Sequence, residues 1–164
     1  MMGIAHNSAG QASARMTRMA MVILIGVISC RRDQLKEKAT TEVSMIAEAV
    51  LGFHSVYGYM PIPNGIDEPA IDDVMPILLM DSESRFAKEL NHRGIRFLDV
   101  AVDRMQEGEF LDPWGTPYQI RFPDVGFDFV KIDGTIIDAP VAVWSVGRNR
   151  KDEAGRGDDI ASWR

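Results

Sequence analysis

Cysteine is nearly absent from this 164-residue sequence, in which Cys30 is the only one. A single cysteine excludes an internal disulfide framework and a cysteine-based zinc site. Lysine and arginine form no long run and the formal net charge is −6, which argues against a nucleic-acid partner. Hydrophobic residues nevertheless make up 46% of the chain, so one folded domain with a real core is expected.

Long apolar runs are also lacking, because the longest one covers only residues 19–28. It is about half the roughly 20 residues that span a bilayer as a helix. Arg15 and Arg18 precede the run, and Arg31 and Arg32 follow it. A basic segment, a short apolar run and a small-residue exit are typical of an export signal. We therefore interpret residues 1–32 as an N-terminal export or anchor segment that attaches the chain to a membrane.

The end of this segment reads Val27-Ile28-Ser29-Cys30. It resembles the lipobox of bacterial lipoproteins, in which the cysteine is lipidated and becomes the mature N-terminus. This resemblance implies lipidation at Cys30. The alternatives are a buried or membrane-facing free cysteine, or a segment 19–30 that remains as a membrane helix.

A helical stripe begins directly after this segment, within a second region that we place at residues 33–164. Its apolar side chains recur every three or four residues, which predicts one amphipathic helix over 33–57. Gly58 and Pro61 are expected to end it. The members of the stripe are Leu35, Ala39, Val43, Ile46, Val50, Phe53 and Tyr57.

The middle of the chain, residues 66–94, predicts two short, irregular helices. The first is expected to start at Asp67-Glu68-Pro69, since acidic residues and proline favour the first helical turn. Pro76 makes this helix irregular. The second is expected to begin near Ser82. Residues 95–102 then have an extended pattern.

Residues 95–164 predict a small antiparallel sheet and a closing loop. Strands are expected at 117–122, 127–132, 135–137 and 140–146, with a hairpin turn at Asp133-Gly134. Asp112-Pro113-Trp114-Gly115 has the residues of a type I turn. The predicted fold class is therefore α+β, with a long amphipathic helix packed on an antiparallel sheet.

The closing loop, residues 147–159, contains the strongest indication of a binding site in the sequence. Asn149, Asp152, Glu153, Asp158 and Asp159 supply hard oxygen atoms, and the glycines of the loop allow tight turns. We expect Asp158 and Asp159, with Asn149 across the loop, to hold an ion. Calcium binds six to eight such oxygens in flexible geometry. We therefore expect a calcium site there. The alternative is a solvated acidic loop whose carboxylates are neutralised by the arginine and lysine residues beside them.

Signs of catalysis are lacking, because the sequence has no nucleophile–base pair, metal triad or phosphate-binding loop. Its three histidines are His6, His54 and His92. His54 lies beside the helical stripe and is expected to be partly buried and structural. We expect a protein that is not an enzyme and has no small-molecule substrate.

Three segments together resemble one protein family. They are Tyr57-Gly58-Tyr59-Met60-Pro61, then Asp112-Pro113-Trp114-Gly115-Thr116-Pro117-Tyr118, and finally Ser145-Val146-Gly147 with Gly157-Asp158-Asp159-Ile160 and Trp163. They are similar to the C-terminal domain of the major pseudopilin of bacterial type II secretion systems and related type IV pilin-like proteins. The resemblance covers roughly residues 40–163.

This resemblance implies a pilin-like fold and a structural role in a helical pseudopilus, which helps to move folded proteins across the outer membrane. It implies other pseudopilins or secretion-apparatus proteins as partners, and a periplasmic domain anchored in the bacterial cell envelope. It also implies calcium in the last loop, at Asn149, Asp158 and Asp159.

The N-terminus departs from that family. Pilin-like precursors carry a Gly-Phe-Thr-Leu-Ile-Glu type motif before an apolar stretch of about 20 residues. Here the corresponding stretch is Arg15-Met16-Thr17-Arg18-Met19-Ala20, without that glycine or glutamate. Two functions follow: a structural component of a secretion or pilus-like apparatus, or an envelope lipoprotein that uses a pilin-like domain as a binding module.

Overall fold

The computed structural model describes the backbone of residues 9–100, 105–106 and 109–164, and the side chains of 31–100, 105 and 109–164. The chain divides into two compact units, Met1–Leu35 and Lys36–Arg164. Most of the predicted anchor segment lies outside the described side chains, so lipidation of Cys30 stays a prediction. In the described part of the chain, no helix combines the length and the apolarity that crossing a membrane requires.

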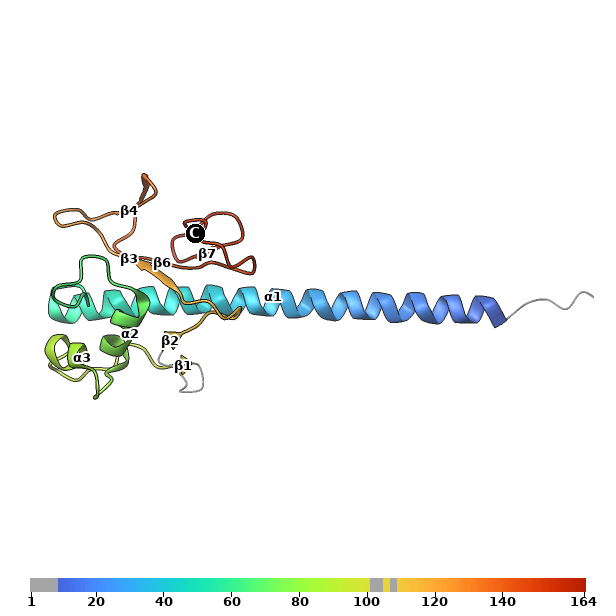
Figure 1. The fold of residues 1–164 in the computed structure, drawn as a ribbon, viewed down its shortest axis with the longest axis horizontal. Helices are drawn as coiled ribbons and strands as arrows, with labels where there is room; N and C mark the ends of the chain where they lie inside the picture. Colours follow the sequence, from blue (N-terminus) through green and yellow to red (C-terminus); the bar gives the residue numbers. More distant parts are fainter. Residues whose placement is uncertain (1–8, 101–104, 107–108) are drawn as a thin grey trace, which may run out of the picture. The chain divides into compact units, whose positions relative to one another are not determined.

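Helix α1 covers Ala9–Tyr57 (Figure 1). The predicted end at Tyr57 is confirmed, and Gly58 follows it with a left-handed φ of 78°. The predicted start at residue 33 is wrong, because the helix is continuous from Ala9. No proline occurs between these ends, so nothing in the backbone chemistry interrupts the helical hydrogen bonds at residue 33.

The predicted stripe of α1 is buried from Ala39 to Phe53, and Tyr57 at its end is partly buried. Val43, Ile46, Val50 and Phe53 have no exposed surface, and each such side chain stabilises the fold by about 1.5–3 kcal/mol. His54 is exposed, so the expectation of a partly buried histidine is wrong. It follows Phe53 directly and is therefore rotated by about 100° from the buried stripe.

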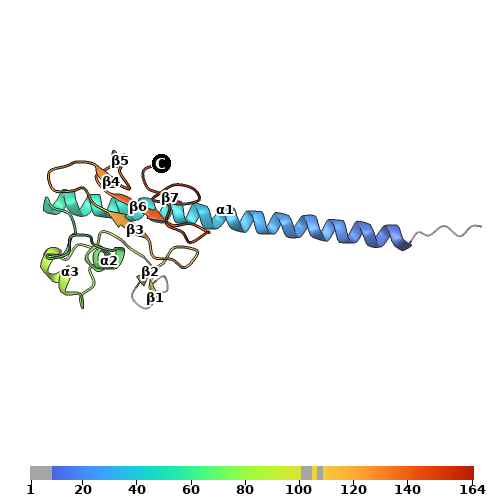
Figure 2. The ribbon, with the colours of Figure 1, turned by 45° about the horizontal axis from the view of Figure 1, so that its top comes forward.

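Two short helices cover part of the buried stripe. Helix α2 covers Ile71–Leu79, with Pro76 inside it, and α3 covers Arg85–Leu90. The N-terminus of α2 is fixed by Asp73, whose carboxylate accepts the Ala70 N–H at 2.9 Å. Both helices confirm the predicted irregular middle, although each begins about three residues later than expected. Figures 1 and 2 show α2 and α3 on one side of the C-terminal half of α1 and β4 on the other.

Within the described residues, the strands form three small antiparallel sheets. The first pairs β1 (Met105–Gln106) with β2 (Glu109–Phe110). The second has the order β3-β6-β7, formed by Gln119–Arg121, Ala142–Ser145 and Ile160–Ala161. The third pairs β4 (Val130–Ile132) with β5 (Thr135–Ile137). The chain is therefore an α+β protein, as predicted.

Most predicted strands are present but shorter. Tyr118 and Ile120 are buried while Gln119 is half-buried, which confirms the predicted alternation around β3. Asp133 and Gly134 both have positive φ, 47° and 75°, so they form the predicted tight hairpin turn between β4 and β5.

The predicted strand 127–132 begins too early. Phe127 is 55% exposed, and its N–H donates to the Asp124 carbonyl at 3.0 Å in a turn. Residues 95–100 belong to no strand, and the rest of that predicted extended segment lies partly outside the described residues. Strand β7 has no counterpart among the predicted elements.

Candidate metal centre

The closing loop connects β6 to β7, and the pairing of these strands brings its ends together. Trp144 lies opposite Ala161 and Ser145 lies opposite Ile160 in this antiparallel pair. A buried strand therefore holds each end of the loop. Buried polar groups of the loop must form hydrogen bonds with one another, with water or with a bound ion.

Three carboxylates gather inside this loop. Glu153, Asp158 and Asp159 each offer an oxygen atom, and these atoms lie within 4.8 Å of one another. Two of the three residues predicted from the sequence, Asp158 and Asp159, are thus brought together. Glu153 supplies the third carboxylate. It was counted among the oxygen-bearing residues of the loop but not among the three predicted ligands, because the sequence does not show that the chain turns back on it.

Asn149, the third predicted ligand, lies beside the cluster with its polar atoms bonded inside the loop. Its side-chain amide donates to Glu153 Oε2 at 3.1 Å, and its Oδ1 accepts the Lys151 N–H at 2.6 Å. Its backbone N–H donates to Asp158 Oδ2 at 3.0 Å. Asn149 therefore orients two of the carboxylates, and its role as a direct ligand stays a prediction.

Asp159 is the buried member of the cluster, with 5% of its surface exposed. Its Oδ2 accepts the N–H groups of Glu153 and Gly155 at 3.0 and 2.9 Å, whereas Oδ1 is buried without a hydrogen-bond partner among the described residues. Burial raises the pKa of this carboxyl; the two N–H groups lower it, and the charges of Asp152 and Glu153 raise it further. An unsatisfied buried carboxylate oxygen costs free energy, and a hard cation is one partner that can satisfy it.

Two glycines make the close approach of these groups possible. A methyl group at Gly157 would overlap the Glu153 carboxylate, and one at Gly147 would overlap the backbone carbonyl of Asp158. Both glycines also have left-handed φ values, 55° and 68°, that side chains disfavour. The glycine pattern of the loop therefore reflects packing around the carboxylates as well as turn formation.

A buried carboxylate ties the start of the loop to the Asp112 turn. Asp112 Oδ1 accepts the N–H groups of Trp114 and Thr116, both at 2.9 Å, and Oδ2 accepts the Ser145 hydroxyl at 2.5 Å. The Ser145 oxygen in turn accepts the Gly147 N–H at 3.1 Å. Two segments of the family resemblance thus belong to one hydrogen-bonded unit.

Two tryptophans support the far side of the loop. Trp144 is buried, and its indole N–H donates to Asp152 Oδ1 at 2.9 Å. Trp163 packs edge-on against it, with ring centroids 5.9 Å apart, and lies against the backbone at Gly155. The loop is therefore held by β6, by the Asp112 turn and by an aromatic pair.

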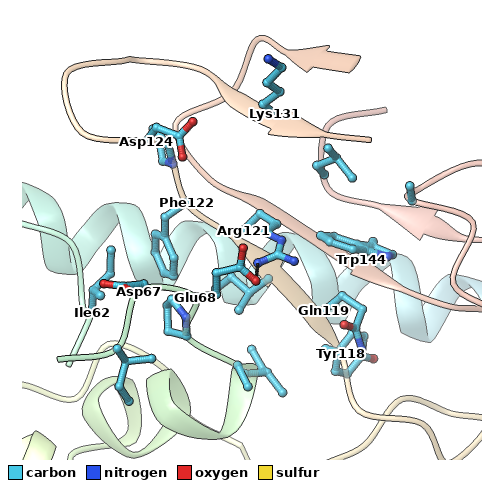
Figure 3. Close-up of a pocket in the computed structure, with 18 of the residues that line it drawn as sticks. Ile62, Asp67, Glu68, Tyr118, Gln119, Arg121, Phe122, Asp124, Lys131 and Trp144 are labelled. Carbon is cyan, nitrogen blue, oxygen red and sulfur yellow. Dashed lines mark ion pairs between the residues drawn. The ribbon is translucent and has the colours of Figure 1, made fainter. Parts of the chain in front are cut away.

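A groove of about 810 Å³ lies near this loop, between the segment before α2, strand β3 and the β4–β5 hairpin (Figure 3). Its lining contains no serine, threonine, cysteine or histidine, and the phenol of Tyr118 is the one side-chain hydroxyl group in it. Asp152 of the closing loop forms part of its wall.

Comparison with protein-family models, with characterised proteins and with solved structures gives no significant match for this chain. Functional assignment therefore depends on the residues and geometry described above.

Proposed function

We propose that this chain is a non-enzymatic, pseudopilin-like structural component of a type II secretion or pilus-like apparatus. In this role its N-terminus anchors it at the membrane of the bacterial envelope, and the region from Lys36 onward folds in the periplasm. The main support is one arrangement: an amphipathic helix segment buried against a small antiparallel sheet whose last loop gathers three carboxylates. A pseudopilin head is expected to have this combination.

Calcium in the closing loop is part of this proposal. Asp159 and Asp158 would hold the ion with Glu153, while Asn149 orients the carboxylates or joins them as a ligand. All of these groups are hard oxygen donors, and the unsatisfied Oδ1 of Asp159 is the atom that most needs a cation. The ion would neutralise the clustered negative charge and order the loop, so its role is structural.

Crosslinking in native membranes tests the assembly role. We expect crosslinks between this chain and other pseudopilins or secretion-apparatus proteins, because a structural subunit must contact its neighbours. If membranes yield crosslinks only to unrelated proteins, or none at all, the proposed function is contradicted.

The second candidate is an envelope lipoprotein with a pilin-like binding domain, and the segment Val27-Ile28-Ser29-Cys30 favours it. Mass spectrometry of the mature N-terminus separates the two proposals. A diacylated Cys30 supports the lipoprotein, whereas an N-methylated residue near Met16 supports a processed pilin-like subunit. A chain that retains residues 19–30 uncleaved agrees with a membrane helix instead.

A further inference from the structure

The groove shown in Figure 3 is strongly acidic. Two cationic side chains, Arg121 and Lys131, face six carboxylates in its lining. Such a concentration of one sign of charge in a concave surface strengthens the local potential. The six carboxylates belong to Asp67, Glu68, Asp72, Asp124, Asp133 and Asp152. We call this surface the acidic groove.

The two cationic side chains of the groove neutralise only part of the negative charge of its carboxylates. Arg121 is engaged with Glu68 through an ion pair of 2.9 Å. The ammonium group of Lys131 points away from that pair in Figure 3. Asp67 and Asp124 are exposed and, within the described part of the chain, take part in no ion pair. They are available to a cationic partner.

Apolar residues at the edge of the groove indicate a protein partner rather than a dissolved ion. Val125 lines the groove and is fully exposed, and Phe127, two residues later, is 55% exposed. Exposed large apolar side chains beside polar ones are typical of protein–protein contact surfaces. The partner should therefore combine positive charge with aliphatic surface, as arginine and lysine side chains do.

The closing loop of the same chain carries such a surface. Arg148, Arg150 and Lys151 are exposed and form no ion pair with any described residue. The backbone beneath them is held by the Asn149 contacts to Lys151 and Asp158. A chain with a net charge of −6 thus presents three cations within four residues. We call these three residues the cationic tip.

We infer that the cationic tip of one copy of this chain docks into the acidic groove of a second copy. In one chain the tip makes no ion pair with its own groove, although Asp152, next to Lys151, forms part of the groove wall. Tip and groove are different patches, so a single tip-in-groove contact is head-to-tail and leaves one tip and one groove open at the ends. Such contacts build rings or open filaments. The inference rests on the proposed assembly function and specifies its subunit contact.

Two charge-reversal variants test the contact. The tip variant is Arg150→Glu with Lys151→Glu, and the groove variant is Asp67→Lys with Asp124→Lys. Sedimentation velocity of the full chain in a neutral detergent at low salt measures association. We expect concentration-dependent oligomers for the wild type, and a dissociation constant raised at least about tenfold in each variant alone, because like charges then face each other.

Mixing the two variants is the decisive measurement. The tip variant keeps a working groove and the groove variant keeps a working tip, so an equimolar mixture should form hetero-oligomers although neither variant associates well alone. The reversed tip and the reversed groove also carry opposite charges, so the mixture pairs complementary surfaces at both contacts. Wild-type oligomers should dissociate as salt rises from about 50 to 500 mM, because exposed charges are screened. The doubly substituted Lys36→Glu, Lys38→Glu chain changes the net charge as the tip variant does, at exposed sites that belong to neither the tip nor the groove lining, and should associate like the wild type.

Thermal melts confirm that each variant folds, and the milder pairs Arg150→Gln with Lys151→Gln and Asp67→Asn with Asp124→Asn replace any variant that does not. The inference is overturned if the wild type stays monomeric, if the variants associate normally, or if their mixture forms no hetero-oligomer. Any of these results leaves the membrane crosslinking test of the proposed function unaffected. Association only with a different protein would likewise overturn it.

Discussion

Ser145 donates a 2.5 Å hydrogen bond to Asp112 although the two residues are 33 positions apart in the chain. Both are buried, with 0% and 4% of their surface exposed. Asp112 organises the turn before β3, and Ser145 is the last residue of β6 before the closing loop. This bond therefore couples the turn to the position of the candidate metal centre.

Replacing Ser145→Ala should lower the free energy of unfolding by about 1–3 kcal/mol, because Asp112 keeps its burial and loses one hydrogen-bond donor. Urea denaturation measures the change. Ser44→Ala is the matched control, since the Ser44 hydroxyl only donates to the Thr40 carbonyl within α1. The free energy of unfolding of Ser44→Ala should stay within about 0.5 kcal/mol of the wild-type value. Equal effects of the two substitutions would contradict the structural role of the buried pair.

Calcium should raise the melting temperature of the wild type relative to the same protein in chelator. At a calcium concentration 100 times the dissociation constant, the stabilisation is about 2.7 kcal/mol. Asp159→Asn should remove most of this response, whereas Asp138→Asn, an exposed position outside the loop, should keep it. Melting curves that coincide with and without calcium would argue against a structural ion.

Gly157→Ala should destabilise the chain and weaken its calcium response. Any side chain at φ 55° is strained by roughly 1–2 kcal/mol, and here the added methyl group also displaces the Glu153 carboxylate. Gly126→Ala is the control, because Gly126 has a φ of 88° but no neighbouring atom within 4 Å of the added carbon. Differential scanning calorimetry should show a larger loss for Gly157→Ala, and only that variant should respond less to calcium.

Asp72→Asn should stabilise the protein at pH 7. Burial raises the pKa of Asp72, the charges of Glu109 and Asp73 raise it further, and the Phe110 N–H partly opposes them. A carboxyl whose pKa is higher in the folded state favours folding when protonated, and this contribution is lost as pH rises through the folded pKa. The gain at pH 7 should stay below about 1 kcal/mol, because the side chain is partly exposed.

Denaturation at two pH values checks the sign of the Asp72 effect. The advantage of Asp72→Asn should shrink as pH falls through the raised pKa of the folded state. It should vanish below the pKa of an unfolded aspartate, about 3.9, because the wild-type carboxyl is then protonated in both states. Asp138→Asn again serves as the control. An advantage that grows toward low pH would contradict the raised pKa.

Local patterns predicted much of the helical and turn structure. The spacing of Ala39, Val43 and Ile46 identified the buried face of α1, because only a helix brings such positions onto one side. The Asp133-Gly134 pair identified its hairpin, since both residues tolerate positive φ. These features depend on nearest neighbours in the chain and need no knowledge of the rest of the fold.

Elements that depend on distant partners were missed or misplaced. Strand β7 has two residues and exists because Ile160 and Ala161 pair with β6. Phe127 has the alternating pattern of a strand, but the turn from Asp124 keeps it out of β4. The start of α1 was placed at a change of composition, although nothing in the backbone ends a helix there.

The sequence by itself determined the α+β class, the buried stripe of α1, the turn at Asp112 and the presence of oxygen-rich residues in the closing loop. Tertiary structure alone decided that Glu153 joins Asp158 and Asp159, that Asn149 is turned to hydrogen bonds within the loop, and that Asp159 keeps one unsatisfied oxygen. The physical reason is that helical periodicity and turn chemistry are local properties. A metal site depends on which atoms a folded loop brings within a few ångströms.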